Sequence, residues 1–158
     1  MPLLEKMPAQ RLKDIKAKYK AMPVPEMPDN EGTELVRNPD DLEGIGMDVR
    51  IMSFGSWRSW VVYQLGELEG ELSLVESLYD LTLAQETGKL EKSAAKRILK
   101  ENLRGMAIES SERLAKLWEE VVELKAERHI LRGRFEYFNS QFETLSRVIT
   151  RRGQDRRL

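Results

Sequence analysis

Cysteine is absent from the 158 residues, and histidine occurs once, at His129. The missing thiols exclude a disulfide framework, a thiolate zinc site and a cysteine nucleophile. The single histidine excludes a metal site built on two or more imidazoles, and also a Cys–His dyad. The sequence therefore predicts no metal and no cofactor.

Long apolar runs are also missing. The longest are a few residues, such as Trp60 to Tyr63, far short of the ~20 residues that span a bilayer. Residues 1–10 have neither the extended apolar stretch nor the small-residue cleavage pattern of a secretory signal. We therefore expect no membrane partner and a location in the cytoplasm.

Proline is confined to the first part of the chain, because all six prolines lie before residue 40. The remainder is rich in Glu, Lys, Leu, Arg and Ala, which favours continuous helix. Aromatic residues make up only 7% and charged residues 34%, a mixture typical of long solvated helices. We predict an all-α fold with an N-terminal arm at residues 1–55 and a helical coiled-coil domain, a long hairpin, at residues 56–158.

The arm is predicted to begin with a short amphipathic helix at residues 9–22. Its apolar stripe consists of Leu12, Ile15, Tyr19 and Met22, and lysines surround it. We expect this helix to dock on a neighbouring helix or chain. Contact of its lysines with nucleic acid, or binding at a membrane surface, are the alternatives.

The rest of the arm, residues 23–55, is rich in proline and glycine and is predicted to be a linker. Between Glu26 and Asp48 it carries eight acidic residues and one basic residue, Arg37. A solvated, partly disordered segment is expected. An acidic arm that lies on a basic surface of its own oligomer, or that mimics nucleic acid, is the alternative.

A first long helix is predicted to begin at Ser56, a good N-cap residue after Gly55, and to end near Gly88. Apolar residues recur along it at alternating intervals of four and three. They are Val61, Leu65, Leu68, Leu72, Val75 and Tyr79.

A second helix, from about residue 106 to 152, has the strongest periodicity in the chain. Ten of eleven positions at strict heptad spacing are apolar, and Arg128 is the exception. The eleven seam residues are Leu114, Leu117, Val121, Leu124, Arg128, Leu131, Phe135, Phe138, Phe142, Leu145 and Ile149. This pattern predicts a coiled-coil seam. Trp118, next to Leu117, is expected in the core.

The seam also predicts a homo-oligomer. The first helix is expected to be the shorter one, so an antiparallel hairpin would leave the end of the seam, from Phe135 to Ile149, partly uncovered, and partner chains would cover it. The residues predicted to form this contact are Leu131, Phe135, Phe138, Phe142, Leu145 and Ile149. Arg128 either sets register and subunit number or extends its guanidinium to solvent.

Basic residues cluster twice, with a net charge of +4 over residues 89–104 and +5 over residues 125–158. Stripes of Lys and Arg attract phosphate. The predicted DNA-binding residues of these clusters are Lys89, Lys92, Lys96, Arg97, Lys100, Arg132, Arg134, Arg151 and Arg152. For the first cluster, a solvated helix face with ion pairs to the acidic linker is the alternative.

Trp57 and Trp60 are predicted to stack on the bases of a single strand. The alternative is a hydrophobic anchor at the start of the helix. The sequence contains no phosphate-binding G-x-x-x-x-G-K-[ST] loop, no H-E-x-x-H and no G-x-S-x-G. We therefore expect a binding protein and not an enzyme.

Several short motifs resemble a known family. A Trp-bearing first helix is followed by E-K-S-A-A-K-R-I at residues 91–98 and by a long helix with Trp118, L-R-G at 131–133 and I-T-R-R at 149–152. Over residues 57–152 this arrangement resembles the UvsY-type recombination mediators of bacteriophages. The resemblance implies a non-enzymatic, ring-forming all-α protein. Such a protein binds single-stranded DNA and helps a recombinase to displace the single-strand-binding protein.

In the resemblance, the DNA-contacting segment corresponds to Lys92, Lys96 and Arg97, and the oligomerisation helix to residues 135–149. The first 55 residues depart from the family pattern and leave room for another partner. Two alternatives remain open. One is a helical phage scaffolding or tail-assembly protein that does not bind DNA. The other is an inhibitor whose acidic linker occupies a nucleic-acid site on a host enzyme.

Overall fold

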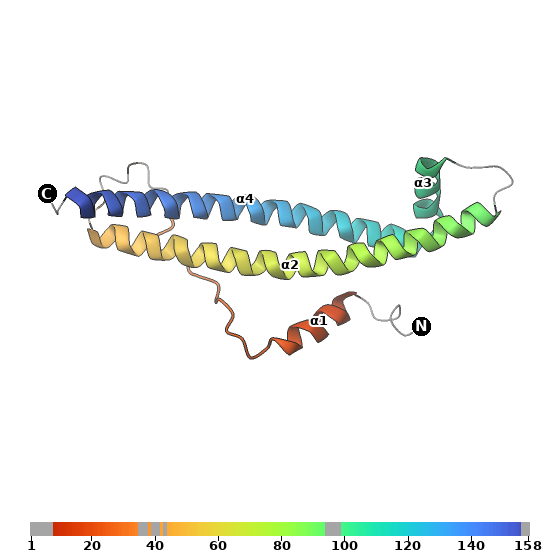
Figure 1. The fold of residues 1–158 in the computed structure, drawn as a ribbon, viewed down its shortest axis with the longest axis horizontal. Helices are drawn as coiled ribbons and strands as arrows, with labels where there is room; N and C mark the ends of the chain where they lie inside the picture. Colours follow the sequence, from red (N-terminus) through yellow and green to blue (C-terminus); the bar gives the residue numbers. More distant parts are fainter. Residues whose placement is uncertain (1–7, 35–37, 39–41, 43, 94–98, 156–158) are drawn as a thin grey trace. The chain divides into compact units, whose positions relative to one another are not determined.

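The computed structural model describes residues 8–34, 38, 42, 44–93 and 99–155. These residues form four helices and no strand: α1 (Pro8–Lys18), α2 (Gly44–Ser93), α3 (Lys100–Ser110) and α4 (Glu112–Asp155) (Figure 1). The predicted all-α class is confirmed. The chain divides into two compact units: unit 1 combines Met1–Met22 with Glu67–Arg128, and unit 2 combines Pro23–Gly66 with His129–Leu158.

Unit 1 is held together by an apolar cluster between α2, α3 and the start of α4. Its buried residues are Leu72, Val75, Tyr79, Ala107, Leu114, Leu117 and Val121. The predicted seam positions of α4 thus pack against the predicted apolar row of α2. The hydroxyl of Tyr79 accepts a hydrogen bond from Nε of Arg104 at 3.1 Å, so this buried phenol keeps a polar partner.

The second predicted helix is interrupted at Ser111, which separates α3 from α4. Ser111 has extended backbone angles (φ −126°, ψ 104°), and its Oγ accepts from the backbone N–H of Leu114 at 3.4 Å. A serine side chain that caps a new helix in this way competes with continuation of the old one. The expectation of one helix from residue 106 is therefore wrong.

Trp118 is also not in the core, because its side chain is 42% exposed. The neighbouring seam residues Leu117 and Val121 are buried instead. Trp118 lies one position beyond the seam and therefore at its flank.

Helix α1 docks on α2 in unit 1. The side chain of Leu12 lies within 3.6 Å of the position that a Cβ on Gly70 would take, and Lys16 forms an ion pair with Glu67. The other residues of the predicted stripe, Ile15, Tyr19 and Met22, are exposed. Part of the amphipathic helix thus contacts its own chain.

Unit 2 pairs the first part of α2 with the last part of α4 in antiparallel fashion (Figure 1). Arg58 on α2 donates a hydrogen bond to the side chain of Asn139 on α4. Nearer the C-terminus of α4, Arg152 donates to the backbone carbonyl of Leu42, just before α2. The core between them consists of Met47, Phe54 and Leu145, with Leu42, Ile51, Phe138, Phe142, Val148 and Ile149 packed around it.

Helix α2 begins at Gly44, so the predicted start at Ser56 is wrong. Every seventh residue from Met47 to Val75 is buried: Met47, Phe54, Val61, Leu68 and Val75. This heptad pattern continues through Gly55, and its packing outweighs the low helix propensity of the glycines. The helix also continues past Gly88 to Ser93.

The longer α2 covers part of the seam end that was predicted to contact partner chains. Its added turns cover the end of the seam within the chain, where Leu145 is buried and Phe138, Phe142 and Ile149 pack on the same cluster. Leu145 is thus covered within the chain, the other residues of the seam end are half-buried, and the oligomeric contact stays a prediction.

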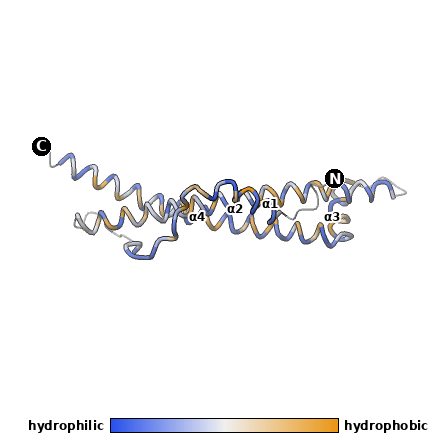
Figure 2. Tube along the Cα trace, turned by 90° about the horizontal axis from the view of Figure 1, so that it is seen from below, coloured by the Kyte–Doolittle hydropathy of each residue, from blue (hydrophilic) through white to orange (hydrophobic). Residues whose placement is uncertain are grey.

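Apolar and polar residues alternate along both long helices (Figure 2). Among the described helices, none carries an apolar stretch sufficient to cross a bilayer.

Candidate nucleic-acid interface

An extended segment of unit 2, residues 23–34, is fastened along α2, and we call it the strap. Three side chains of α2 at spacings of three and four donate hydrogen bonds to its backbone carbonyls. Arg50 donates to Glu34 O at 3.0 Å, Ser53 to Glu31 O at 2.7 Å, and Trp57 to Asp29 O at 2.8 Å. Because residues three and four apart share one helix face, these donors form a ladder. These three hydrogen bonds hold the strap against α2, which the composition of the predicted linker did not indicate.

A tight turn lies near the C-terminal end of the strap. The carbonyl of Asn30 accepts from the N–H and from the hydroxyl of Thr33, and Gly32 adopts a φ of +75°. A positive φ at the third position of a turn strongly favours glycine. A Cβ at Gly32 would also lie 3.3 Å from Cγ1 of Val49. Glycine thus permits both the turn and its close approach to α2.

Trp57 is a structural anchor of this site. It is only 9% exposed, its ring stacks on Phe138 with centroids 5.5 Å apart, and Trp60 meets it edge-on at 5.6 Å. Because the indole N–H also donates to the strap, both the ring and the polar atom of Trp57 are used in packing. This arrangement agrees with the alternative interpretation of Trp57 as a hydrophobic anchor. Trp60 is half-buried and remains the candidate for stacking on a base.

A groove of about 230 Å³ lies between the strap, α2 and α4, and we call it the Trp60 groove. It is lined by Asn30, Thr33, Trp57, Trp60, Val61, Arg134 and Phe138. It brings together three of the predicted DNA-binding residues: Trp57, Trp60 and Arg134. Arg134 is the one charged residue among these lining residues, and its side chain is exposed. The groove therefore combines aromatic surface, one cation and uncharged hydrogen-bonding groups.

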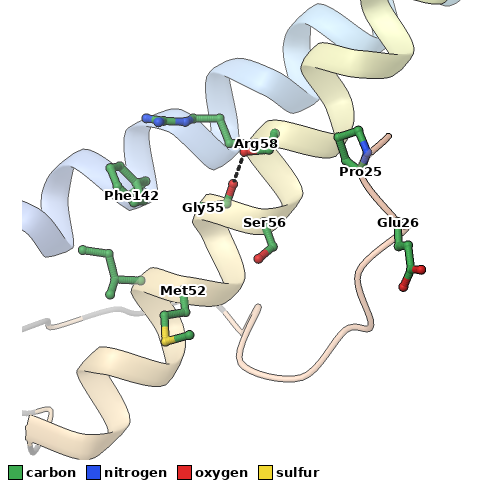
Figure 3. A pocket seen from close by; sticks show the side chains of 9 residues that line it. Pro25, Glu26, Met52, Gly55, Ser56, Arg58 and Phe142 are labelled. Atoms are coloured by element: carbon green, nitrogen blue, oxygen red, sulfur yellow. Dashed lines mark hydrogen bonds between the residues drawn. The ribbon is translucent and has the colours of Figure 1, made fainter. Parts of the chain in front are cut away.

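A second, larger groove of about 630 Å³ involves another part of the strap (Figure 3). Its charged residues are Arg58 and Glu26. The guanidinium of Arg58 lies 4.3 Å above the ring of Phe142 and donates to Asn139 Oδ1 at 3.1 Å. Because this cation already has partners and a carboxylate lies nearby, the second groove suits an anionic ligand less well than the Trp60 groove.

The remaining predicted DNA contacts are distributed over both units. Lys89 and Lys92 are exposed on α2 in unit 1, and Lys89 forms an ion pair with Glu86 at 2.7 Å. Lys96 and Arg97 lie outside the described residues, as does the side chain of Lys100. The Trp60 groove, in contrast, is formed by residues of unit 2.

In unit 2, Arg132 and Arg151 are exposed on α4. Arg152 is half-buried and donates to the carbonyl of Leu42 at 2.8 Å, which closes the end of the helix pair. Arg152 thus has a structural role in the described fold.

Among the predicted oligomerisation residues, Leu145 is buried and the others are half-buried. Phe138, Phe142 and Ile149 pack against the unit 2 core, and Phe138 also supports Trp57. Leu131 and Phe135 complete this seam on α4. Part of the apolar surface of the seam is thus used within the chain.

Two groove residues, Asn30 and Thr33, were missed from the sequence. The signal was the run P-D-N-E-G-T at residues 28–33, a turn composition. That composition indicates a turn but says nothing about the helix on which the turn lies.

Comparison with known proteins finds no matching family, no similar curated protein and no similar solved structure. The functional argument therefore depends on the residues of this chain.

Proposed function

We propose that this protein is a non-enzymatic accessory protein of bacteriophage recombination that binds single-stranded DNA. The observation that carries the proposal is the Trp60 groove, where an indole, a guanidinium and two uncharged polar side chains meet. Indole rings stack on any nucleobase, and a guanidinium pairs with phosphate. An aromatic surface beside a single cation fits a nucleotide unit of a strand.

The resemblance to the UvsY-type mediators gives this activity its context. The protein would act in the host cytoplasm as a homo-oligomer, with a recombinase and a single-strand-binding protein as partners. Repetition of the groove in each copy would let one strand contact several subunits. Exposed basic residues such as Lys89, Lys92 and Arg132 would contact phosphates between the grooves.

Fluorescence anisotropy with a labelled oligo(dT) tests the proposal. Trp60→Ala should weaken binding roughly 5- to 150-fold, because one stacked base contributes about 1–3 kcal/mol. Trp118→Ala is the matched control, since Trp118 is exposed in unit 1 and lies outside the groove. Equal losses in the two variants would contradict the assignment of the groove.

Salt dependence tests the phosphate contact. Affinity should fall steeply as salt rises, and Arg134→Ala should reduce the slope of log K against log salt by about one. Arg147→Ala is the control, because Arg147 is exposed and pairs with Glu143 on its own helix. A free nucleotide that competes as well as a strand would argue against a strand-binding function.

One observation favours the alternative function in phage structure or assembly. Ile15, Tyr19 and Met22 leave an apolar stripe exposed on the N-terminal segment, and an assembly protein would seat such a stripe on a neighbouring copy. Light scattering with and without oligonucleotide separates the two proposals. An assembly that is indifferent to DNA supports the alternative.

A further inference from the structure

The larger groove of unit 2 has no part in strand binding, and we call it the Met52 groove. It lies between α2, α4 and the strap (Figure 3), and Ile51, Met52 and Phe142 give it an apolar lining. The side chain of Met52 is 72% exposed. A large apolar side chain that is open to solvent beside a groove is typical of a surface on which a partner packs.

The strap makes the surroundings of this groove acidic. Between Pro23 and Glu34 it contains no basic residue and four acidic residues: Glu26, Asp29, Glu31 and Glu34. Glu26 lines the groove itself. Glu34 pairs with Arg50, and the other three form no ion pair with a residue that the structure describes.

The one cation among the residues that line the Met52 groove is Arg58. Its guanidinium is already placed over the ring of Phe142 and donates to Asn139. It therefore offsets little of the negative charge of the strap, and the groove suits a partner that is both apolar and basic.

A segment of this chemistry occurs in the same chain, at α1 and the turn after it. Residues 11–20 contain five basic residues and one acidic residue. Lys13, Lys18 and Lys20 are exposed, and none of them forms an ion pair with a residue that the structure describes. Unpaired cations on this segment thus match unpaired carboxylates on the strap.

The same segment has an apolar stripe. Ile15, Tyr19 and Met22 are exposed and lie four and three positions apart. Bonds from Tyr19 N to Lys16 O and from Met22 N to Tyr19 O continue the turns past the end of α1. Anchors at i, i+4 and i+7 are the usual means by which an amphipathic helix occupies an apolar groove. Leu12 and Lys16 hold α1 on unit 1 of its own chain, and the stripe is left exposed to a second copy.

We propose that the α1 segment of one copy docks in the Met52 groove of a second copy. The apolar stripe packs on Met52 and Phe142, and the unpaired lysines lie beside the carboxylates of the strap. Each copy offers one segment and one groove, so the contact is head-to-tail and links copies into a ring or a filament. The inference rests on the homo-oligomer of the proposed function and needs no nucleic acid.

Sedimentation velocity of the full-length protein over a range of concentrations tests the contact with two double variants. Tyr19→Ser/Met22→Ser removes two anchors of the α1 segment, and Glu26→Lys/Met52→Lys makes the groove basic. Circular dichroism of both should match the wild type, because all four residues are exposed. Each variant alone should raise the dissociation constant for self-association about tenfold or more, through lost anchors in one and facing like charges in the other.

An equimolar mixture of the two variants should form a dimer and nothing larger, because one intact segment and one intact groove remain in each pair. Trp118→Ser/Val122→Ser is the matched control and should associate like the wild type, since it removes two exposed apolar side chains outside both surfaces.

Wild-type association in either double variant, or a mixture that stays monomeric, overturns the inference. A wild type that is monomeric at every concentration overturns both the inference and the homo-oligomer. Strand binding is decided separately, by the oligo(dT) titration of Trp60→Ala.

Discussion

Gly55 of α2 lies directly against the ring of Phe142 on α4, so that a Cβ at Gly55 would stand 3.3 Å from Cε2 of that ring. Arg58, one turn further along α2, places its guanidinium 4.3 Å from the ring centroid. The ring of Phe142 thus contacts α2 at two residues, Gly55 and the guanidinium of Arg58. The missing side chain at Gly55 lets the two helices approach in unit 2.

A larger residue at Gly55 should therefore destabilise the protein. We expect Gly55→Leu to lower the free energy of unfolding by about 1–3 kcal/mol, the usual cost of overpacking a fitted interface. Gly66→Leu is the matched control on the same helix, because nothing lies within 4 Å of a Cβ there. That control should be neutral or stabilising, since leucine has the higher helix propensity. Urea unfolding followed by circular dichroism measures both.

The covered seam gives a second prediction. Leu145→Ala should cost about 2–5 kcal/mol of unfolding free energy, because Leu145 is 1% exposed in the unit 2 core. Val122→Ala, at an exposed position of α4, should cost far less. Measured by urea unfolding, the Leu145→Ala loss should be the same at low and high protein concentration. A loss that changes with concentration would show that this residue packs between copies.

The strap gives a third prediction. Ser53→Ala and Trp57→Phe each remove one donor to the strap and should each destabilise it by about 0.5–1.5 kcal/mol. A Glu-specific protease should then cleave faster within residues 23–34. Ser59→Ala is the control, because its hydroxyl bonds only to Gly55 O of its own helix. Equal cleavage rates in all three variants would mean that the strap is held by other contacts.

Glu120 in unit 1 gives a prediction for pH dependence. Burial, followed by the charges of Glu71 and Glu123, raises the pKa of its carboxyl group. A raised folded pKa adds stability that is present below the ordinary carboxyl pKa and is lost as pH rises through the raised value. Glu120→Gln should therefore be more stable than the wild type at neutral pH, by about 0.2–0.5 kcal/mol. The difference should vanish in acid.

Glu112→Gln is the control, because the expected change in stability at neutral pH has the opposite sign. Thermal unfolding across a range of pH measures both variants. Its hydrogen bond and ion pair with Lys116 hold the pKa of Glu112 below its usual value. That stabilisation is present above the ordinary carboxyl pKa and is lost as pH falls through the lowered value. This variant should be less stable than the wild type at neutral pH. If both variants change stability in the same direction, the charges of Glu71 and Glu123 do not act on Glu120 as described.

The helical character could be predicted because it depends on local pattern. The seam residues from Leu114 to Ile149 are all helical, and the α1 region is helical near its predicted position. The boundaries could not be predicted, because Gly55 and Gly88 carry the composition of helix ends while packing keeps both inside α2. At Ser111 the error is the reverse: a break between α3 and α4 was not predicted, because no proline or glycine lies beside this residue.

The candidate site was predictable only in part. Trp57, Trp60 and Arg134 were recognised by residue type, and the structure brings them into one groove. Trp57 packs as the hydrophobic anchor that the sequence left open, because its ring stacks on Phe138 and its N–H donates to the strap. Asn30 was missed because its position depends on a strap that the composition indicates to be disordered.

The sequence by itself determined that this protein is helical, has no thiol chemistry, and carries apolar heptads that must be buried. These properties follow from composition and from residues within a few positions of each other. The tertiary structure decided what covers the seam and where the groove lies. Both depend on contacts between distant residues, such as Trp57 with Asp29 and Arg58 with Asn139. Local propensity does not encode such contacts, because their free energy appears only once the helices and the strap have packed.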